Sequence, residues 1–238
     1  MKELEFLQEG AHSLLSIQLS RVQLEAFRLY REELLAWNER FNLTAITDPF
    51  LIESKHFLDS MTCIQAMNPS HETVVDVGTG AGFPGLPLKI ICPQMKLTLV
   101  EATEKKVRFC RHMADVLGME NVDVIHARAE ELGQQALFRG QFQISLARAV
   151  APLPVLLEYL LPLLPVGGRV VAQKGETAPA ETHAAENALR ILGGRISRLV
   201  QVDLPRVPER RYLVVVDKVS ETPQKYPRRS GMPAKRPL

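Results

Sequence analysis

A strand-like run that leads into a glycine-rich loop constrains this chain more than any other segment. Residues 74–77 are apolar apart from Asp76, and glycines then follow at alternate positions, at Gly78, Gly80 and Gly82. Glycine lets the backbone turn sharply and come close to a ligand that a β-carbon would push away. Pro84 suits the first turn of a following helix, whose free N–H groups favour an anion. The segment therefore predicts a cradle for a nucleotide-type cofactor.

Two cofactor classes fit the glycine spacing. Gly80, Gly82 and Gly85 match the dinucleotide fingerprint, with an acidic residue, Glu101, nineteen positions after Gly82. Alternatively, Gly78, Gly80 and Gly82 with an acid two positions earlier resemble the first motif of the S-adenosylmethionine-dependent methyltransferases.

Asp76 favours the methyltransferase interpretation. A carboxylate that ends a buried strand is costly unless it meets polar partners. Loop amides or the ammonium group of a methionine moiety would supply them, whereas a pyrophosphate would repel it. Pro84 and Pro87 also interrupt the helix start that a dinucleotide fold normally packs against its strand.

Alternating elements predict the fold class. Strands are expected at 73–77, 97–101, 122–126, 143–147, 169–173, 196–203 and 212–217, with helices at 104–117, 152–164 and 178–192. This pattern predicts an α/β, Rossmann-like fold with a mainly parallel seven-stranded sheet, helices on both faces, and an antiparallel hairpin at one end. Ligands bind outside the carboxyl ends of such strands, so Glu101 is expected to stand beside the glycine loop and accept the ribose hydroxyls. The alternative is a surface acid in a strand-to-helix turn.

The first 70 residues are helical in pattern. Apolar side chains recur at steps of three and four from Leu24 to Phe41, including Phe27, Leu34 and Trp37. We expect this stripe to pack against the main domain, and we keep RNA stacking by Trp37 as an alternative. The predicted organisation is a helical extension over 1–70, ended by a turn at 68–70, a methyltransferase domain over 71–218, and a basic, flexible tail over 219–238.

Several separated segments, in the same order, resemble the glucose-inhibited division protein B family. The match runs from about Leu24 to Lys218, and Glu101 departs from it, since relatives often carry Asp there. The matching segments are 37–46 (WNERFNLTAI), 55–60 (KHFLDS), the glycine loop, 129–130 (AE), 145–149 (SLARA) and 173–175 (QKG).

The resemblance implies a bacterial enzyme that uses S-adenosyl-L-methionine to methylate N7 of a specific guanosine in 16S ribosomal RNA of the small subunit. It places an adenine contact at Ala129 and Glu130. Phe83, inside the loop, is expected to cover the cofactor, and Arg148, at a strand end, to meet the cofactor carboxylate or an RNA phosphate. The expected cofactor residues are Asp76, Gly78, Gly80, Gly82, Phe83, Glu101, Ala129, Glu130 and Arg148.

Five further residues are candidates for the methyl-transfer cleft: Asn38, Asn42, Thr44, His56 and Lys174. Each has a plainer interpretation, as a solvated amide, a structural histidine or a lysine that snorkels to the surface. The chemistry requires no catalytic base, because guanine N7 already carries a free lone pair. No metal ligands stand at the necessary spacing, so we expect no metal.

Positive charge is concentrated at the C-terminal end. Residues 218–238 hold six basic residues and one acid, whereas the rest of the chain has a net charge of about −3. A mobile basic arm could neutralise RNA phosphates, although a merely solubilising tail is the alternative. The candidate RNA-binding residues are Arg206, Arg210, Arg211, Lys225, Arg228 and Arg229.

The remaining expectations come from what the sequence lacks. Its three cysteines, Cys63, Cys92 and Cys110, are widely spaced, which is typical of buried thiols in a reducing compartment. We found no stretch of eighteen apolar residues and no secretion-signal pattern, and we therefore expect a cytoplasmic monomer with no membrane contact. A non-enzymatic binder that keeps the cradle and a small-molecule methyltransferase stay open as alternatives.

Overall fold

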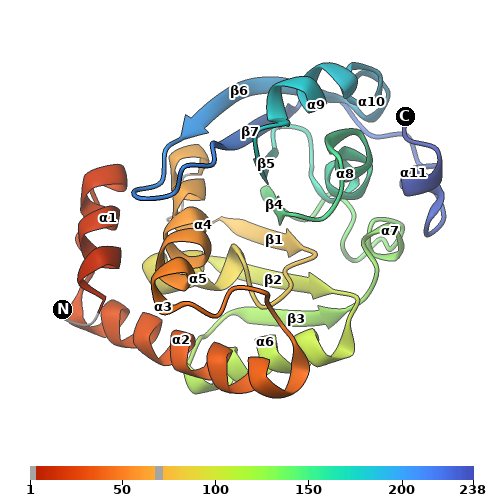
Figure 1. Cartoon of the computed structure of the whole chain (residues 1–238). Coiled ribbons are helices and arrows are strands. Elements are labelled where there is room, and N and C mark those ends of the chain that lie inside the picture. Colours follow the sequence, from red (N-terminus) through yellow and green to blue (C-terminus); the bar gives the residue numbers. More distant parts are fainter. Residues whose placement is uncertain (1–3, 68–71) are drawn as a thin grey trace.

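The computed structural model describes residues 4–67 and 72–238, and its core is a seven-stranded sheet with the order β3-β2-β1-β4-β5-β7-β6 (Figure 1). All neighbouring strands are parallel except β7, which runs antiparallel to β5 and β6. The predicted α/β sheet with a terminal hairpin is therefore confirmed. The strands are β1 (Thr73–Val77), β2 (Lys96–Glu101), β3 (Val122–His126), β4 (Ile144–Arg148), β5 (Arg169–Lys174), β6 (Gly194–Val202) and β7 (Arg211–Lys218).

Helices cover both faces of the sheet because the central strands alternate their apolar side chains between two cores. In β1, Val74 packs into one core while Val75 and Val77 pack into the other. Parallel strands buried on both faces need apolar side chains on each. The helices that follow β1 are α5 (Gly85–Ile91), α6 (Glu104–Val116), α7 (Ala129–Leu132), α8 (Leu153–Leu160), α9 (Ala178–Ala184), α10 (Glu186–Leu192) and α11 (Met232–Lys235).

Two predicted helices are shorter than expected. The helix expected over 152–164 ends at Leu160 and continues only as a 3₁₀ turn, Leu161–Leu163. Pro162 has no N–H to donate to the preceding turn, so the α-helical ladder stops there. The helix expected over 178–192 divides at Ala185, whose N–H is shared between the carbonyls of Glu181 and Thr182.

The N-terminal segments pack on the same core as α5 and α6, so the helical extension is not a separate body. Phe27, Tyr30 and Leu34 are fully buried, and the Trp37 ring meets Phe109 of α6 edge-on at 5.5 Å. The predicted packing stripe is confirmed. The segments are α1 (Glu5–Leu15), α2 (Arg21–Phe41), α3 (Pro49–Leu51), a π-helical stretch (Ile52–Leu58), α4 (Asp59–Met61) and a 3₁₀ stretch (Thr62–Ala66). The turn expected at 68–70 lies outside the described residues.

The C-terminal tail, residues 219–238, differs from the expected mobile arm. It passes along α7 and α8 and ends in α11 (Figure 1). Its anchor is Arg228, whose backbone N–H and guanidinium both donate to the carboxylate of Glu158 on α8. Glu158 is fully buried, and a buried carboxylate needs a partner of this kind. Part of the tail's positive charge thus serves the fold.

Candidate functional site

The alternate glycines of the loop after β1 serve two different purposes. Gly80 has φ +63°, and apart from its chain neighbours no atom of residues 4–67 and 72–238 lies within 4 Å of where its β-carbon would be. Gly82, with φ +94°, is closely packed, since a β-carbon there would lie 2.5 Å from the Tyr30 hydroxyl. That hydroxyl also donates to the Ala81 carbonyl at 2.6 Å. Gly80 therefore leaves ligand space open, whereas Gly82 lets α2 hold the loop.

Asp76 holds the glycine loop through one carboxylate oxygen, whereas its other oxygen is not hydrogen-bonded to a described residue. Its Oδ2 accepts from the Thr79 hydroxyl at 2.6 Å and from the Gly85 N–H at 2.8 Å. Its Oδ1 is buried and has no hydrogen-bond partner in the part of the chain that the structure describes. Burial raises the pKa of this carboxyl from 3.8 to about 6, against the opposing effect of those two hydrogen bonds. A buried anion with a free lone pair fits a cationic ligand group.

Glu101, at the end of β2, closes the loop from the side. Its Oε2 accepts from the Gly80 N–H at 2.9 Å, and its Oε1 accepts from the Thr103 N–H at 2.8 Å. Each carboxylate oxygen retains a second lone pair that can accept a hydroxyl. Sequence reasoning placed this side chain beside the loop, and the structure confirms that position.

A cavity of about 260 Å³ opens at the carboxyl ends of β1, β2 and β3. Parallel sheets bind ligands at this edge. Four expected cofactor residues, Gly78, Glu101, Ala129 and Glu130, belong to its lining, and alanines supply much of the remainder. The lining residues are Val77, Gly78, Val100, Glu101, Ala102, Ala127, Arg128, Ala129, Glu130, Val150, Ala151, Tyr159 and Ala234. The Glu101 carboxylate and a lining that is otherwise mainly apolar fit the ribose and the base of an adenosyl group.

Phe83 does not cover this cavity, contrary to expectation. Its ring is 4% exposed and lies between Tyr30, stacked at 5.4 Å, and His56, stacked at 4.4 Å. The guanidinium carbon of Arg148 lies 4.9 Å from the ring centroid. An apolar ring gains more from this buried stack than from exposure on the loop. Phe83 thereby fixes the loop to the N-terminal segments.

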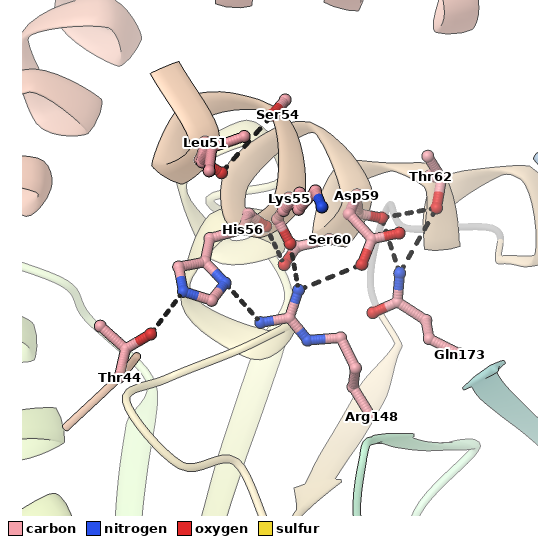
Figure 2. Close-up of polar contacts among 10 residues, drawn as sticks. All are labelled: Thr44, Leu51, Ser54, Lys55, His56, Asp59, Ser60, Thr62, Arg148 and Gln173. Carbon is pink, nitrogen blue, oxygen red and sulfur yellow. Dashed lines mark hydrogen bonds and ion pairs between the residues drawn. The ribbon is translucent and has the colours of Figure 1, made fainter. Parts of the chain in front are cut away.

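A polar network joins the N-terminal segments to the end of β4 (Figure 2). Arg148 donates to the Lys55 carbonyl at 3.0 Å, to Oδ2 of Asp59 at 3.2 Å, and to Nδ1 of His56 at 3.2 Å. Nε2 of His56 lies 2.9 Å from the Thr44 hydroxyl. Arg148 is thus engaged within the protein, and the network gives it a supporting role that the sequence did not indicate.

The network fixes the protonation state of His56. Burial and the neighbouring charge of Arg148 lower its pKa from 6.5 to about 3, so the ring is neutral at pH 7. Because Arg148 can only donate, Nδ1 must be the acceptor, and Nε2 must carry the hydrogen toward Thr44. Both ring nitrogens are engaged, which leaves no basic lone pair for a substrate.

A second cavity, of about 360 Å³, lies at the ends of β4 and β5. Lys174 reaches across it to the Ala151 carbonyl at 2.5 Å and to Glu181 at 2.7 Å. The lining residues are Asp59, Arg148, Ala149, Val150, Ala151, Pro152, Gln173, Lys174, Gly175, Glu181 and Arg211. Val150 and Ala151 line both cavities, so the loop after β4 separates them.

Two buried polar atoms beside the second cavity lack partners. Gln173 turns its amide nitrogen to the Asp59 carbonyl at 2.6 Å, which leaves its Oε1 without a hydrogen bond (Figure 2). The Nε of Arg211 is likewise unpartnered. Unsatisfied buried groups are costly, so their presence beside this cavity requires a structural or functional explanation. Sequence reasoning missed Asp59 and Gln173, although both lie inside the matching segments 55–60 and 173–175.

The remaining cleft candidates divide by position. Asn38 accepts the N–H groups of Leu43 and Thr44 with its Oδ1, at 2.6 and 2.9 Å, and so shapes the turn that presents Thr44. Asn42 ends α2 in a left-handed conformation, with φ +47°, and its side chain is exposed. Of these candidates, Lys174 lines the second cavity, and Thr44 and His56 belong to the network of Arg148, which itself lines that cavity; Asn42 is exposed.

The basic residues predicted to bind RNA do not form one patch. Arg206, in the β6–β7 loop, places its guanidinium carbon 5.7 Å from the ring centroids of both Phe6 and Phe50. Lys225 lies over the Tyr226 ring, and Arg228 is paired with Glu158. Arg210 and Arg229 are exposed at the surface, and Arg211 lines the second cavity.

Over residues 4–67 and 72–238, no helix is long and apolar enough to cross a membrane, and no cluster of residues suited to hold a metal ion occurs.

Comparison with known proteins identifies the family and the fold of the chain. The family model described as rRNA small subunit methyltransferase G matches residues 23–210, which confirms the family resemblance. A relative from Alkaliphilus metalliredigens named ribosomal RNA small subunit methyltransferase G is 42% identical over the full length of both chains. Another of that name, from Pelotomaculum thermopropionicum, is 46% identical over 98% of each. A solved S-adenosylmethionine-dependent methyltransferase from Aquifex aeolicus, 20% identical, aligns with a TM-score of 0.55 over 72% of this chain and 94% of its own, which shows the fold.

Proposed function

Because the chain belongs to the rRNA small subunit methyltransferase G family, we propose that it methylates N7 of one guanosine in 16S ribosomal RNA, with S-adenosyl-L-methionine as donor. The chain is thus a ribosomal RNA methyltransferase. The target atom, the cofactor site and the RNA contacts belong to the proposal.

The observation that carries this proposal is the pair of cavities separated by the loop after β4. The first is lined by Gly78 and the carboxylate of Glu101. The glycine loop that begins at Gly78 adds the open position at Gly80, and Asp76, which is hydrogen-bonded to this loop, has an oxygen without a partner among the described residues. In the second, Arg148, Lys174 and Arg211 bring positive charge to a space that can receive a base and its phosphate. Methyl transfer needs neighbouring donor and acceptor sites, because guanine N7 must come into direct contact with the methyl group.

The chain's residues act by alignment. Bound S-adenosylmethionine supplies a methyl group on an electrophilic sulfonium centre. Guanine N7 carries its lone pair in the ring plane, so no proton has to leave before attack. His56 has no free basic nitrogen, which agrees with this requirement. Correct orientation of acceptor and donor can supply most of the rate enhancement.

Charge around the second cavity is partly balanced. Arg148 is paired with Asp59 and Lys174 with Glu181, which leaves Arg211 as the cation whose Nε is unpartnered. Since the purine becomes cationic as the methyl arrives, the paired acids would offset that charge. We assign Arg211 to an RNA phosphate, and we extend the proposal to action as a monomer in the cytoplasm.

The test is methyl transfer from labelled S-adenosylmethionine to three acceptors. These are bare 16S RNA, intact small subunits from a strain that lacks this protein, and a metabolite extract. Labelled RNA is then cleaved chemically at N7-methylguanosine. One labelled guanosine is expected, and the acceptor that carries it identifies the recognised particle. Label in metabolites alone, or at another RNA atom, would contradict the proposal.

A further inference from the structure

The C-terminal tail reaches the cofactor cavity. Ala234, in α11, lines the same cavity as Gly78, Glu101 and Glu130. In Figure 1, α11 lies beside α8, on the side of the sheet edge where the strands end. We call residues 231–235 the C-terminal wall.

The path of the chain into this wall is fixed by buried contacts. Arg139 donates to the carbonyls of Tyr226 at 2.7 Å and Thr222 at 2.8 Å. The ion pair between Arg228 and the fully buried Glu158 follows directly along the chain. Hydrogen bonds to two carbonyls and one buried ion pair order this segment before a ligand binds. Ligand binding therefore costs little further conformational entropy in the segment.

The wall is also joined to a residue of the cavity itself. Glu130 accepts the Gly231 N–H with its Oε1 at 2.9 Å, and it is hydrogen-bonded to the Tyr159 hydroxyl. Glu130 and Tyr159 both line the cavity. Movement of the wall therefore changes the surroundings of two residues that a cofactor would contact.

The position of the wall indicates which part of the ligand it meets. Gly78 of the glycine loop and Glu101 at the end of β2 both line the cavity, and the Glu101 carboxylate offers polar partners to a ribose. Ala234 shares the lining with Ala129, Glu130 and Tyr159, and the family resemblance places an adenine contact at Ala129 and Glu130. A mainly apolar slot of this kind suits a planar purine ring.

We propose that the C-terminal wall closes the purine side of the cofactor pocket and thereby sets the affinity for the adenosyl group. This inference rests on the proposed function, since it requires an adenosyl cofactor in this cavity. It assigns the end of the tail a part in cofactor binding, beyond the RNA contact that its charge suggests.

The test compares S-adenosylhomocysteine binding by calorimetry in the full chain and in a variant that lacks residues 230–238. The truncation keeps Arg228 and its ion pair and removes the wall. We expect the dissociation constant to rise about tenfold, because one apolar side of the pocket is lost. The matched control is the full chain with Arg236→Ala, which loses an exposed charge just outside the wall and should bind normally.

A second measurement keeps the inference testable if the truncated chain fails to fold. Amide hydrogen exchange of the intact protein is recorded with and without S-adenosylhomocysteine, and the amides of 231–235 should exchange more slowly with ligand. Normal binding by a folded truncated chain, or unchanged exchange in the wall, would overturn the inference alone. Absence of binding by the full chain would instead overturn the cofactor assignment, and the wall with it.

Discussion

The pH dependence of cofactor affinity tests the buried acid of the glycine loop directly. Asp76 is fully buried, and its pKa is raised from 3.8 to about 6. Only the ionised form attracts a cationic α-amino group, and that group stays protonated below about pH 7.7. From a pKa of about 6, about 90% of Asp76 is ionised at pH 7 and about 10% at pH 5. The apparent dissociation constant scales inversely with the competent fraction, so it should rise about tenfold over this interval.

The raised pKa of Asp76 also affects the stability of the fold. The resulting pH dependence is opposite to that of a typical ion-paired acid, whose pKa is lowered in the folded state. The folded pKa lies above the unfolded one, so Asp76 stabilises the cofactor-free fold fully below pH 3.8. That contribution, about 3 kcal/mol from a shift of about two units, is lost as the pH rises through 6. At neutral pH the ionised Asp76 therefore lowers the stability of the cofactor-free fold, and a bound cation would reduce that loss.

The assay is calorimetric titration with S-adenosylmethionine at pH 5, 6 and 7, in the native chain and in Asp76→Asn. The asparagine variant should bind weakly at pH 7 and show no pH dependence, because its amide does not titrate. His56 has a pKa of about 3 and does not contribute in this range. A native dissociation constant that changes less than about twofold between pH 7 and pH 5 would refute the role assigned to Asp76.

Two further predictions use matched pairs of substitutions. Gly80→Ala should reduce cofactor affinity at least about 100-fold while costing about 1–2 kcal/mol of unfolding free energy, because the new methyl meets strain but no protein atom. Gly118→Ala, at φ +57° with equally open space, should cost the same stability and leave binding unchanged; equal binding by both variants would contradict this. Arg228→Ala should destabilise the fold by about 3 kcal/mol in urea denaturation, since Glu158 is left as an uncompensated buried charge. Exposed Arg229→Ala should cost less than about 0.5 kcal/mol, and similar losses for the two would disprove a structural role of the ion pair.

The parts of the fold that the sequence predicted depend on local signals. Alternating strands and helices, the glycine spacing and the acid before it lie within short windows, and they led to the sheet and to the edge where ligands bind. Asp76 was interpretable because a carboxylate in a buried strand must find polar partners, whatever the rest of the chain does. Glu101 followed from the rule that parallel strands present their carboxyl ends together.

The failures share a different origin, since each depends on contacts between distant segments. Phe83 looked like an exposed ring because Tyr30 and His56, which enclose it, come from other helices. The tail looked mobile because its composition is basic and rich in proline. A usable signal did exist: Glu158 is the only charged residue in the otherwise apolar run 152–164, and such an acid requires a buried partner.

The network around Arg148 explains why the histidine beside the second cavity is not available as an acid or a base. Arg148 serves as the donor to His56 and Asp59 at once, so it keeps the imidazole neutral and anchors the carboxylate. Both groups thereby serve as supports for the end of β4, the strand that leads into the loop between the two cavities. A reaction whose acceptor already has a free lone pair gains nothing from a proton carrier but depends on the position of that loop. The polar residues of the site are therefore best understood as determinants of geometry, and their substitution should misalign the acceptor without altering a catalytic pKa.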